Sequence, residues 1–64
     1  MTNIEPLRKS RNLTRRDLAQ KVGVTEGNIY KWERGHNYPG IRYAIQLADF
    51  FEVSLDYLLG RSTA

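Results

Sequence analysis

The side chains that could do chemistry in this chain are mainly cations and hydrogen-bond donors, without the pairing that catalysis needs. Ten Lys or Arg stand against seven Asp or Glu in 64 residues, with one histidine and no cysteine. His36 lacks partners at metal-ligand spacing, and Ser10, Ser54 and Ser62 lack the base and orienting acid that activate a hydroxyl. We therefore expect no enzyme, no metal site and no cofactor, and no small-molecule ligand is evident.

The cations are concentrated in the first two thirds of the chain. Residues 1–42 carry nine Lys or Arg and four Asp or Glu, whereas residues 43–64 carry one Arg and three acids. Such a basic end suits a polyanion, because neutralising phosphates supplies much of the affinity for nucleic acid and steers the encounter. A solvated charged face is the alternative interpretation of the same distribution.

Composition also limits where the chain is expected to work. The lack of cysteine removes disulfides, which fits a reducing compartment. No apolar run approaches the ~20 residues that span a bilayer, and no charged-then-apolar leader is evident. We expect residues 1–64 to form one soluble, cytoplasmic domain that makes no membrane contact.

The elements that must position the polar side chains are helices. Apolar residues recur at helical spacing, and no stretch alternates for long enough to predict a strand, so we expect a compact all-α fold. In the first helix, Ile4 and Leu7 should face inward, whereas Arg8, Lys9 and Arg11 should point to water. The first expected helix begins near Thr2 or Asn3, either of which could be its N-cap, and runs to about 12. The other four expected helices run over 15–22, 26–34, 41 to about 52, and 55–59.

Capping residues mark the start of three of these helices. Thr14 should cap the second helix, with Asp17 completing a capping box. Thr25 and Ser54 should cap the third and fifth helices through their hydroxyls.

One window of the chain satisfies several packing requirements together. Counting from Arg15, Ala19 is fifth, Gly23 ninth and Ile29 fifteenth. The small residue lets the second helix approach, the glycine accepts a left-handed turn, and the aliphatic side chain packs beneath that turn. We therefore expect a helix-turn-helix over about 15–34.

The aromatic residues should divide between core and surface. Trp32 aligns with Ile29 on the inward stripe of its helix, so we expect it in the core rather than as a base-stacking platform. Phe50, Tyr43 and Tyr57 exceed what a small core can hide, which leaves one or more of them for a subunit interface.

A family resemblance is carried by three blocks in order: LTRRDLAQKVGVTEGNIYKWERG, Pro39, and LADFFEVSLDYLLG. With them, the chain resembles the lambda-repressor-like, Cro/C1-type helix-turn-helix (XRE) family over about residues 5–60. That family is found in phage repressors and small bacterial regulators. The resemblance implies a compact five-helix domain that binds operator DNA, commonly as a two-fold dimer.

The resemblance assigns base reading to the start of the third helix. Glu26, Gly27, Asn28 and Lys31 match positions at or beside the base edges of the major groove. Lys31 could donate to guanine, and Glu26 could accept from cytosine or simply favour the positive end of the helix dipole. Gly27 costs ~1 kcal/mol relative to Ala in a helix. Either close approach to DNA compensates for that cost, or the position is merely exposed.

Phosphate contacts are implied on both sides of that helix, from the start of the second helix and from the loop after the third. Arg15 stands where relatives often have glutamine, with a solvated helix-start residue as the alternative. Arg42 matches a position from which some relatives reach the minor groove. The full set expected to contact the backbone is Arg15, Arg16, Thr25, Tyr30, Arg34, His36, Asn37, Tyr38 and Arg42.

The dimer surface implied by relatives lies at Glu52, Leu55, Tyr57 and Leu58. We therefore expect a sequence-specific regulator of transcription that binds double-stranded DNA. Its simplest form is a bacterial or phage-encoded repressor that occupies a palindromic operator as a homodimer, with the third helix in the major groove. An antitoxin or another protein-interaction module with the same fold is the alternative. RNA binding is disfavoured, because the deep, narrow groove of A-form RNA does not admit a helix.

Overall fold

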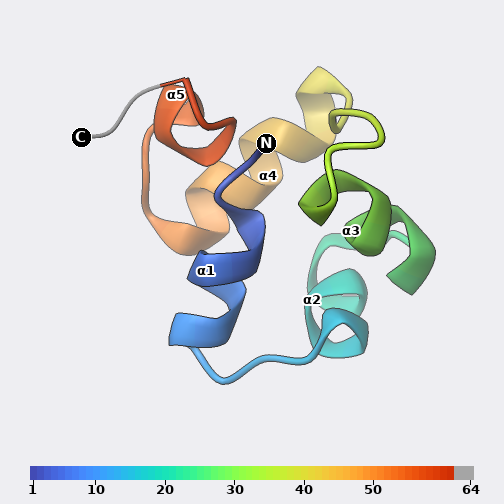
Figure 1. Ribbon diagram of the computed structural model, residues 1–64. Coiled ribbons are helices and arrows are strands. Elements are labelled where there is room, and N and C mark those ends of the chain that lie inside the picture. Colours follow the sequence, from blue (N-terminus) through green and yellow to red (C-terminus); the bar gives the residue numbers. More distant parts are fainter. Residues whose placement is uncertain (62–64) are drawn as a thin grey trace.

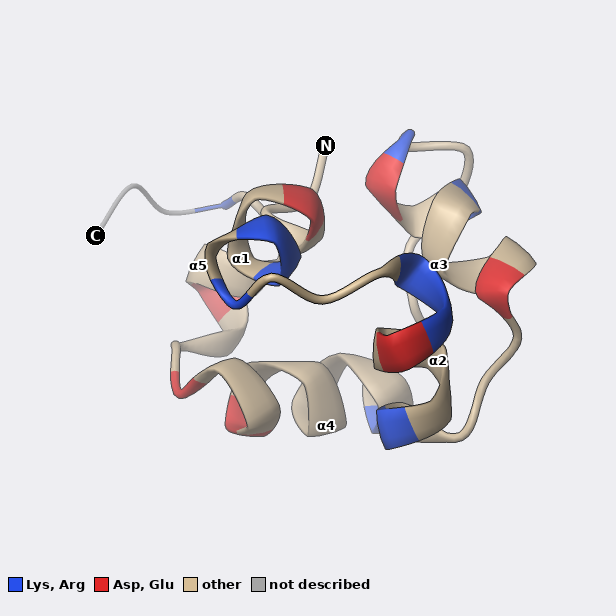
Figure 2. Cartoon of the chain, turned by 90° about the horizontal axis from the view of Figure 1, so that it is seen from below, with Lys and Arg blue, Asp and Glu red and all other residues tan. Residues whose placement is uncertain are grey.

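The computed structural model describes residues 1–61, and this range contains five α-helices and no strand (Figure 1). α4 crosses the molecule, with α1 and α5 toward one of its ends and α2 and α3 toward the other (Figure 2). The predicted all-α, five-helix fold is confirmed, and none of the described helices is long and apolar enough to cross a bilayer. The helices are α1 (Ile4–Ser10), α2 (Arg15–Val22), α3 (Glu26–Glu33), α4 (Ile41–Phe51) and α5 (Leu55–Leu58).

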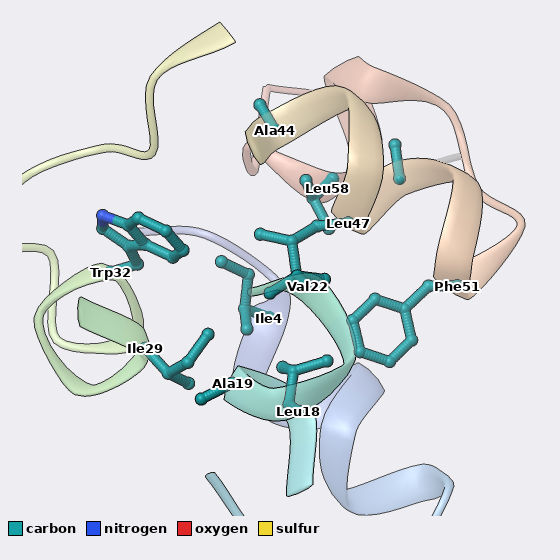
Figure 3. Close-up of a cluster of buried hydrophobic side chains, with 11 residues drawn as sticks. Ile4, Leu18, Ala19, Val22, Ile29, Trp32, Ala44, Leu47, Phe51 and Leu58 are labelled. Carbon is teal, nitrogen blue, oxygen red and sulfur yellow. The ribbon is translucent and has the colours of Figure 1, made fainter. Parts of the chain in front are cut away.

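Every helix contributes one completely buried apolar side chain. The five residues with 0% exposure, one from each of α1 to α5 in turn, are Ile4, Leu18, Ile29, Leu47 and Leu58 (Figure 3). Burying a side chain of this size stabilises a fold by roughly 1.5–3 kcal/mol. Each helix is therefore tied to a common core and not only to its neighbour in sequence.

The aromatic residues follow the predicted division in part. Trp32 is 5% exposed and lies in the core, as predicted. Tyr43 packs against it with ring centroids 6.2 Å apart, and Phe50 meets Phe51 edge-on at 5.1 Å. The guanidinium carbon of Arg11 lies 5.3 Å from the Phe50 ring centre. Tyr43 and Phe50 are thus partly covered by contacts within the chain itself.

The predicted helix caps are confirmed. Thr14 Oγ1 accepts a hydrogen bond from Asp17 N at 3.0 Å, and Asp17 Oδ2 accepts one from Thr14 N at 3.0 Å. The hydroxyls of Thr25 and Ser54 each accept from the amide three residues later, at 3.2 and 3.0 Å. Gly23 follows α2 in the left-handed conformation, with φ of 75°, so the local signals set where α2 begins and ends.

α1 begins where predicted but ends earlier. It begins at Ile4 after the N-cap residue Asn3, whose side chain makes no cap hydrogen bond and donates from Nδ2 to Tyr57 O at 2.7 Å. It ends at Ser10, since Asn12 adopts the left-handed conformation with φ of 57°. α3, α4 and α5 each end one residue earlier than predicted.

Arg8 is buried, which corrects the expectation that it points to water. It lies one turn after Ile4, on the inward side of α1, and is 7% exposed. Its Nε donates to Glu33 Oε2 at 2.6 Å, its Nη2 to Glu33 Oε1 at 3.3 Å, and its Nη1 to Leu13 O at 2.8 Å. Because the Glu33 side chain is itself fully buried, this ion pair fixes the end of α3 against α1.

Residues 1–3 join α3 to α5, and we call them the N-terminal strap. Thr2 Oγ1 donates to Trp32 O at 3.2 Å, and Asn3 N donates to Leu58 O at 2.9 Å. Gly60 is left-handed with φ of 78°, and a Cβ there would collide with the carbonyl oxygen of the first residue. The contact between the strap and the turn after α5 therefore requires glycine at this position.

Candidate nucleic-acid interface

α2 and α3 pack as the predicted helix-turn-helix. Ala19 is 4% exposed and Ile29 is 0% exposed, so both lie in the helix contact. Gly23 N and Val24 N both donate to Ala19 O, at 2.9 and 3.0 Å. These bonds satisfy a carbonyl at the end of α2 through the left-handed glycine, so α3 leaves the turn at a fixed angle.

The outer face of α3 carries the residues expected to read bases. Glu26, Gly27 and Lys31 are exposed, and Asn28 is half-buried. A Cβ at Gly27 would have only Thr25 Oγ1 within 4 Å, at 3.9 Å, so no packing within the chain requires glycine there. This face can present a carboxylate, an amide and an ammonium group to a partner, on a helix whose inner side is held in the core.

Cations and polar groups flank α3 on both sides. Arg16, at the start of α2, is exposed, whereas the side chain of Arg15 is 29% exposed. Figure 2 shows the basic start of α2 across the connection from the basic end of α1. The other residues expected to contact the DNA backbone are all exposed: Thr25, Tyr30, Arg34, His36, Asn37, Tyr38 and Arg42.

Arg15 is held by a buried acid that the sequence analysis missed. Its Nε donates to Glu33 Oε1 at 2.9 Å, beside the contacts that Arg8 makes with the same carboxylate. The hydrogen bond to Glu33 raises the pKa of Arg15 above its ordinary value. Glu33 therefore joins cations of α1 and α2 to the end of α3. The available signal was its position four residues after Ile29 on the inward stripe, where an acid needs a buried cation.

Glu5 links α1 to the start of α2. Its Oε2 lies 3.3 Å from Lys9 Nζ and 3.9 Å from the Nη2 atoms of both Arg8 and Arg15. The hydrogen bond with Lys9 is the main cause that lowers the pKa of Glu5. In residues 1–61, no group of three His, Asp or Glu side chains gathers that could hold a metal ion.

Tyr30 meets two arginines on the exposed side of the helix-turn-helix. Its ring centre lies 5.0 Å from the guanidinium carbon of Arg15 and 5.7 Å from that of Arg34. His36 meets the ring edge-on, with centroids 6.0 Å apart. One aromatic side chain thus contacts cations of both α2 and α3, an arrangement that the helical spacing does not indicate.

The residues expected at a dimer surface do not all reach the surface. Leu58 is 0% exposed and belongs to the core, so it has no area to offer a partner, and its assignment to the interface is corrected. Glu52 is exposed, and Leu55 and Tyr57 are half-buried. A surface groove of about 400 Å³ is lined by Leu7, Glu52, Val53, Ser54 and Tyr57.

The sequence and the fold both match proteins of known class. The family model described as Helix-turn-helix matches residues 4–58. The chain is 38% identical over 56 residues to the HTH-type transcriptional activator BcrR of Enterococcus faecalis, covering 88% of this chain and 28% of that protein. It is 33% identical over 54 residues to the cryptic phage CTXphi transcriptional repressor RstR of Vibrio cholerae, covering 84% of this chain and 48% of that protein.

A solved structure has the same fold. The P22 c2 repressor protein in complex with synthetic operator 9T matches with a TM-score of 0.85 and 30% sequence identity, over 92% of this chain and 89% of that chain. The chain spans about half or less of the length of BcrR and RstR, so the likeness to those two regulators concerns only that part of them.

Proposed function

This chain belongs to the Cro/C1-type helix-turn-helix family, and from this premise we propose that it binds double-stranded operator DNA to regulate transcription. The observation that carries the proposal is that the two sides of α3 differ in burial and in polarity. Its inner side is locked into the core, and its outer side offers hydrogen-bonding groups between flanking cations. The named relatives are transcriptional regulators and not enzymes.

In this proposal the start of α3 enters the major groove and reads base edges. Glu26, Gly27, Asn28 and Lys31 are the proposed readers. Lys31 donates to the guanine acceptors, and Glu26 accepts from a cytosine amino group; a good contact of this kind discriminates by ~1–3 kcal/mol. Gly27 has no side chain, so it allows the helix backbone to come close to the bases.

The proposed phosphate contacts clamp the strand on both sides of that groove. Groups at the start of α2 and α3 serve one side, and the loop after α3 serves the other. Arg42 at the start of α4 reaches toward the minor groove, whose narrowness over A·T tracts attracts arginine. The proposed contacts are Arg15, Arg16, Thr25, Arg34, His36, Asn37, Tyr38 and Arg42.

We further propose that two copies bind a palindromic operator about a two-fold axis. Their α3 helices would then enter major grooves ~34 Å apart, one turn of the duplex. Glu52, Leu55 and Tyr57, beside the groove after α4, supply the proposed dimer contacts. Occupancy of such an operator suffices to block polymerase, so the proposed mode of regulation is repression, which requires no chemistry.

The test is to select bound duplexes from a random DNA pool at about 150 mM salt, where non-specific phosphate binding is weak and base readout survives. We expect enrichment of an inverted repeat with half-sites about one helical turn apart. Enrichment of a single half-site would support base reading but contradict the dimer. Folded protein that enriches no sequence would refute specific DNA recognition and favour the protein-interaction module.

A further inference from the structure

We propose that Tyr30 is a positioning residue, whose ring fixes the guanidinium groups of Arg15 and Arg34 as a matched pair of phosphate contacts. The inference rests on the proposed DNA binding but assigns Tyr30 a role different from direct contact. Tyr30 acts through the two arginines, one from each helix of the helix-turn-helix.

The ring is within cation–π range of both guanidinium groups. The distances of 5.0 Å to Arg15 and 5.7 Å to Arg34 fall inside the limit of about 6 Å for this attraction. Arg34 is four residues after Tyr30, one turn further along, whereas Arg15 belongs to the other helix. One ring can attract both cations, because the face of an aromatic ring is negative.

The two arginines depend on Tyr30 to different degrees. Arg15 has other anchors, because its Nε donates to the buried carboxylate of Glu33 and its Nη2 lies 3.9 Å from Glu5 Oε2. Arg34 forms no ion pair with any carboxylate in residues 1–61. The ring of Tyr30, 5.7 Å from the guanidinium carbon of Arg34, is therefore the contact by which we propose that this side chain is positioned.

The exposure of the Tyr30 side chain distinguishes a positioning role from a role in the core. Tyr30 is 43% exposed, whereas its neighbours Ile29 and Trp32 fill the core at 0% and 5%. The ring therefore adds little to the core. Ordering a flexible arginine before DNA arrives removes part of the conformational cost of binding, and this is the function we assign to it.

The test measures binding of the full chain to a labelled duplex of about 30 base pairs, between about 50 and 200 mM salt. Mixed sequence suffices, because phosphate contacts do not depend on sequence. Tyr30→Phe keeps the ring and should stay within about twofold of wild type. Tyr30→Leu removes the ring and should bind about fivefold more weakly, with the salt slope reduced by about one ion.

A double-mutant cycle tests whether Tyr30 affects DNA binding through the arginine that it contacts. The loss from Tyr30→Leu should shrink when Arg34→Gln is already present, because the positioned cation is gone. The matched control is Arg16→Gln, which removes a neighbouring cation that does not contact the ring. In that background the full loss should remain, since independent sites add.

A readout without DNA keeps the proposal testable in the free protein. NMR order parameters of the Arg34 Nε–H should fall in Tyr30→Leu and stay unchanged in Tyr30→Phe, at equal thermal stability. Equal losses for Phe and Leu would assign the effect to a direct hydroxyl contact and overturn the proposal. Wild-type protein that binds no duplex would defeat the proposed function as well, whereas wild-type binding with unimpaired Tyr30→Leu would defeat only the role of Tyr30.

Discussion

Replacing Gly27 by Ala should stabilise the fold and weaken operator binding at the same time. Gly27 is the second residue of α3, and glycine in a helix costs up to about 1 kcal/mol relative to alanine. The added Cβ would meet only Thr25 Oγ1, at 3.9 Å, so no clash offsets the gain. For a domain of this size, about 1 kcal/mol corresponds to a rise of roughly 4–8 °C in Tm.

Gly23→Ala is the matched control, because it differs in one physical variable. A Cβ at Gly23 would have no heavy atom within 4 Å and so would not clash either, but Gly23 has φ of +75°. A left-handed conformation costs an L-residue about 1–2 kcal/mol. The same chemical change should therefore raise Tm at Gly27 and lower it at Gly23.

Thermal unfolding followed by the emission of the buried Trp32 measures both variants, and titration of the selected operator measures the effect on binding. A Gly27→Ala protein with unchanged or lower Tm would contradict the reasoning on helix propensity. A higher Tm with undiminished operator affinity would instead show that the backbone at Gly27 does not approach DNA closely.

Three further predictions test other parts of the molecule. Arg8→Met leaves the buried Glu33 carboxylate with Arg15 as its remaining cation, so its cost in urea unfolding should be at most about 3–5 kcal/mol, the cost of an unpaired buried charge. Arg8→Met combined with Glu33→Leu should recover most of the loss. Hydrogen bonds from the backbone and the hydroxyl of Thr14 lower the pKa of Asp17. The ionised Asp17 therefore stabilises the fold above the ordinary carboxyl pKa, and this contribution is lost as the pH falls through the lowered pKa. Asp17→Asn should therefore flatten the decline of stability below about pH 4, as measured by denaturation at each pH. Lys31→Ala should relax base preference in the selection, whereas Arg15→Ala should weaken all duplexes alike and reduce the salt slope by about one; equal losses on operator and random DNA for both would overturn this division.

The parts of the fold that follow from local sequence were predictable. Thr14, Thr25 and Ser54 bond to amides three residues away, so each helix start depends on a short segment alone. Gly23 similarly marks the turn between α2 and α3, because few other residues accept its φ. The helix-turn-helix could therefore be located before any contact between distant residues was known.

The parts that depend on distant partners were not predictable in the same way. Arg8 pairs with Glu33 across 25 positions, and a charged residue considered alone is expected in water. Asn3 gives its amide to Tyr57 O across 54 positions, so it fails as a side-chain cap. Leu58 sits in a half-apolar final helix, where spacing alone did not separate a core position from an interface position. The base and phosphate contacts remain proposals, because they depend on a partner molecule.

The hydrogen bonds of the N-terminal strap can form only after the helices that it contacts have packed. Its hydrogen bonds to Trp32 O and Tyr57 O span 30 and 54 positions, so forming them closes one loop of about half the chain and one of most of it, each at a cost in chain entropy. They reach full strength only when α3 and α5 are already in place. Amide exchange should therefore find the Asn3 N–H among the first to open, and each opening loosens α3 and α5 together.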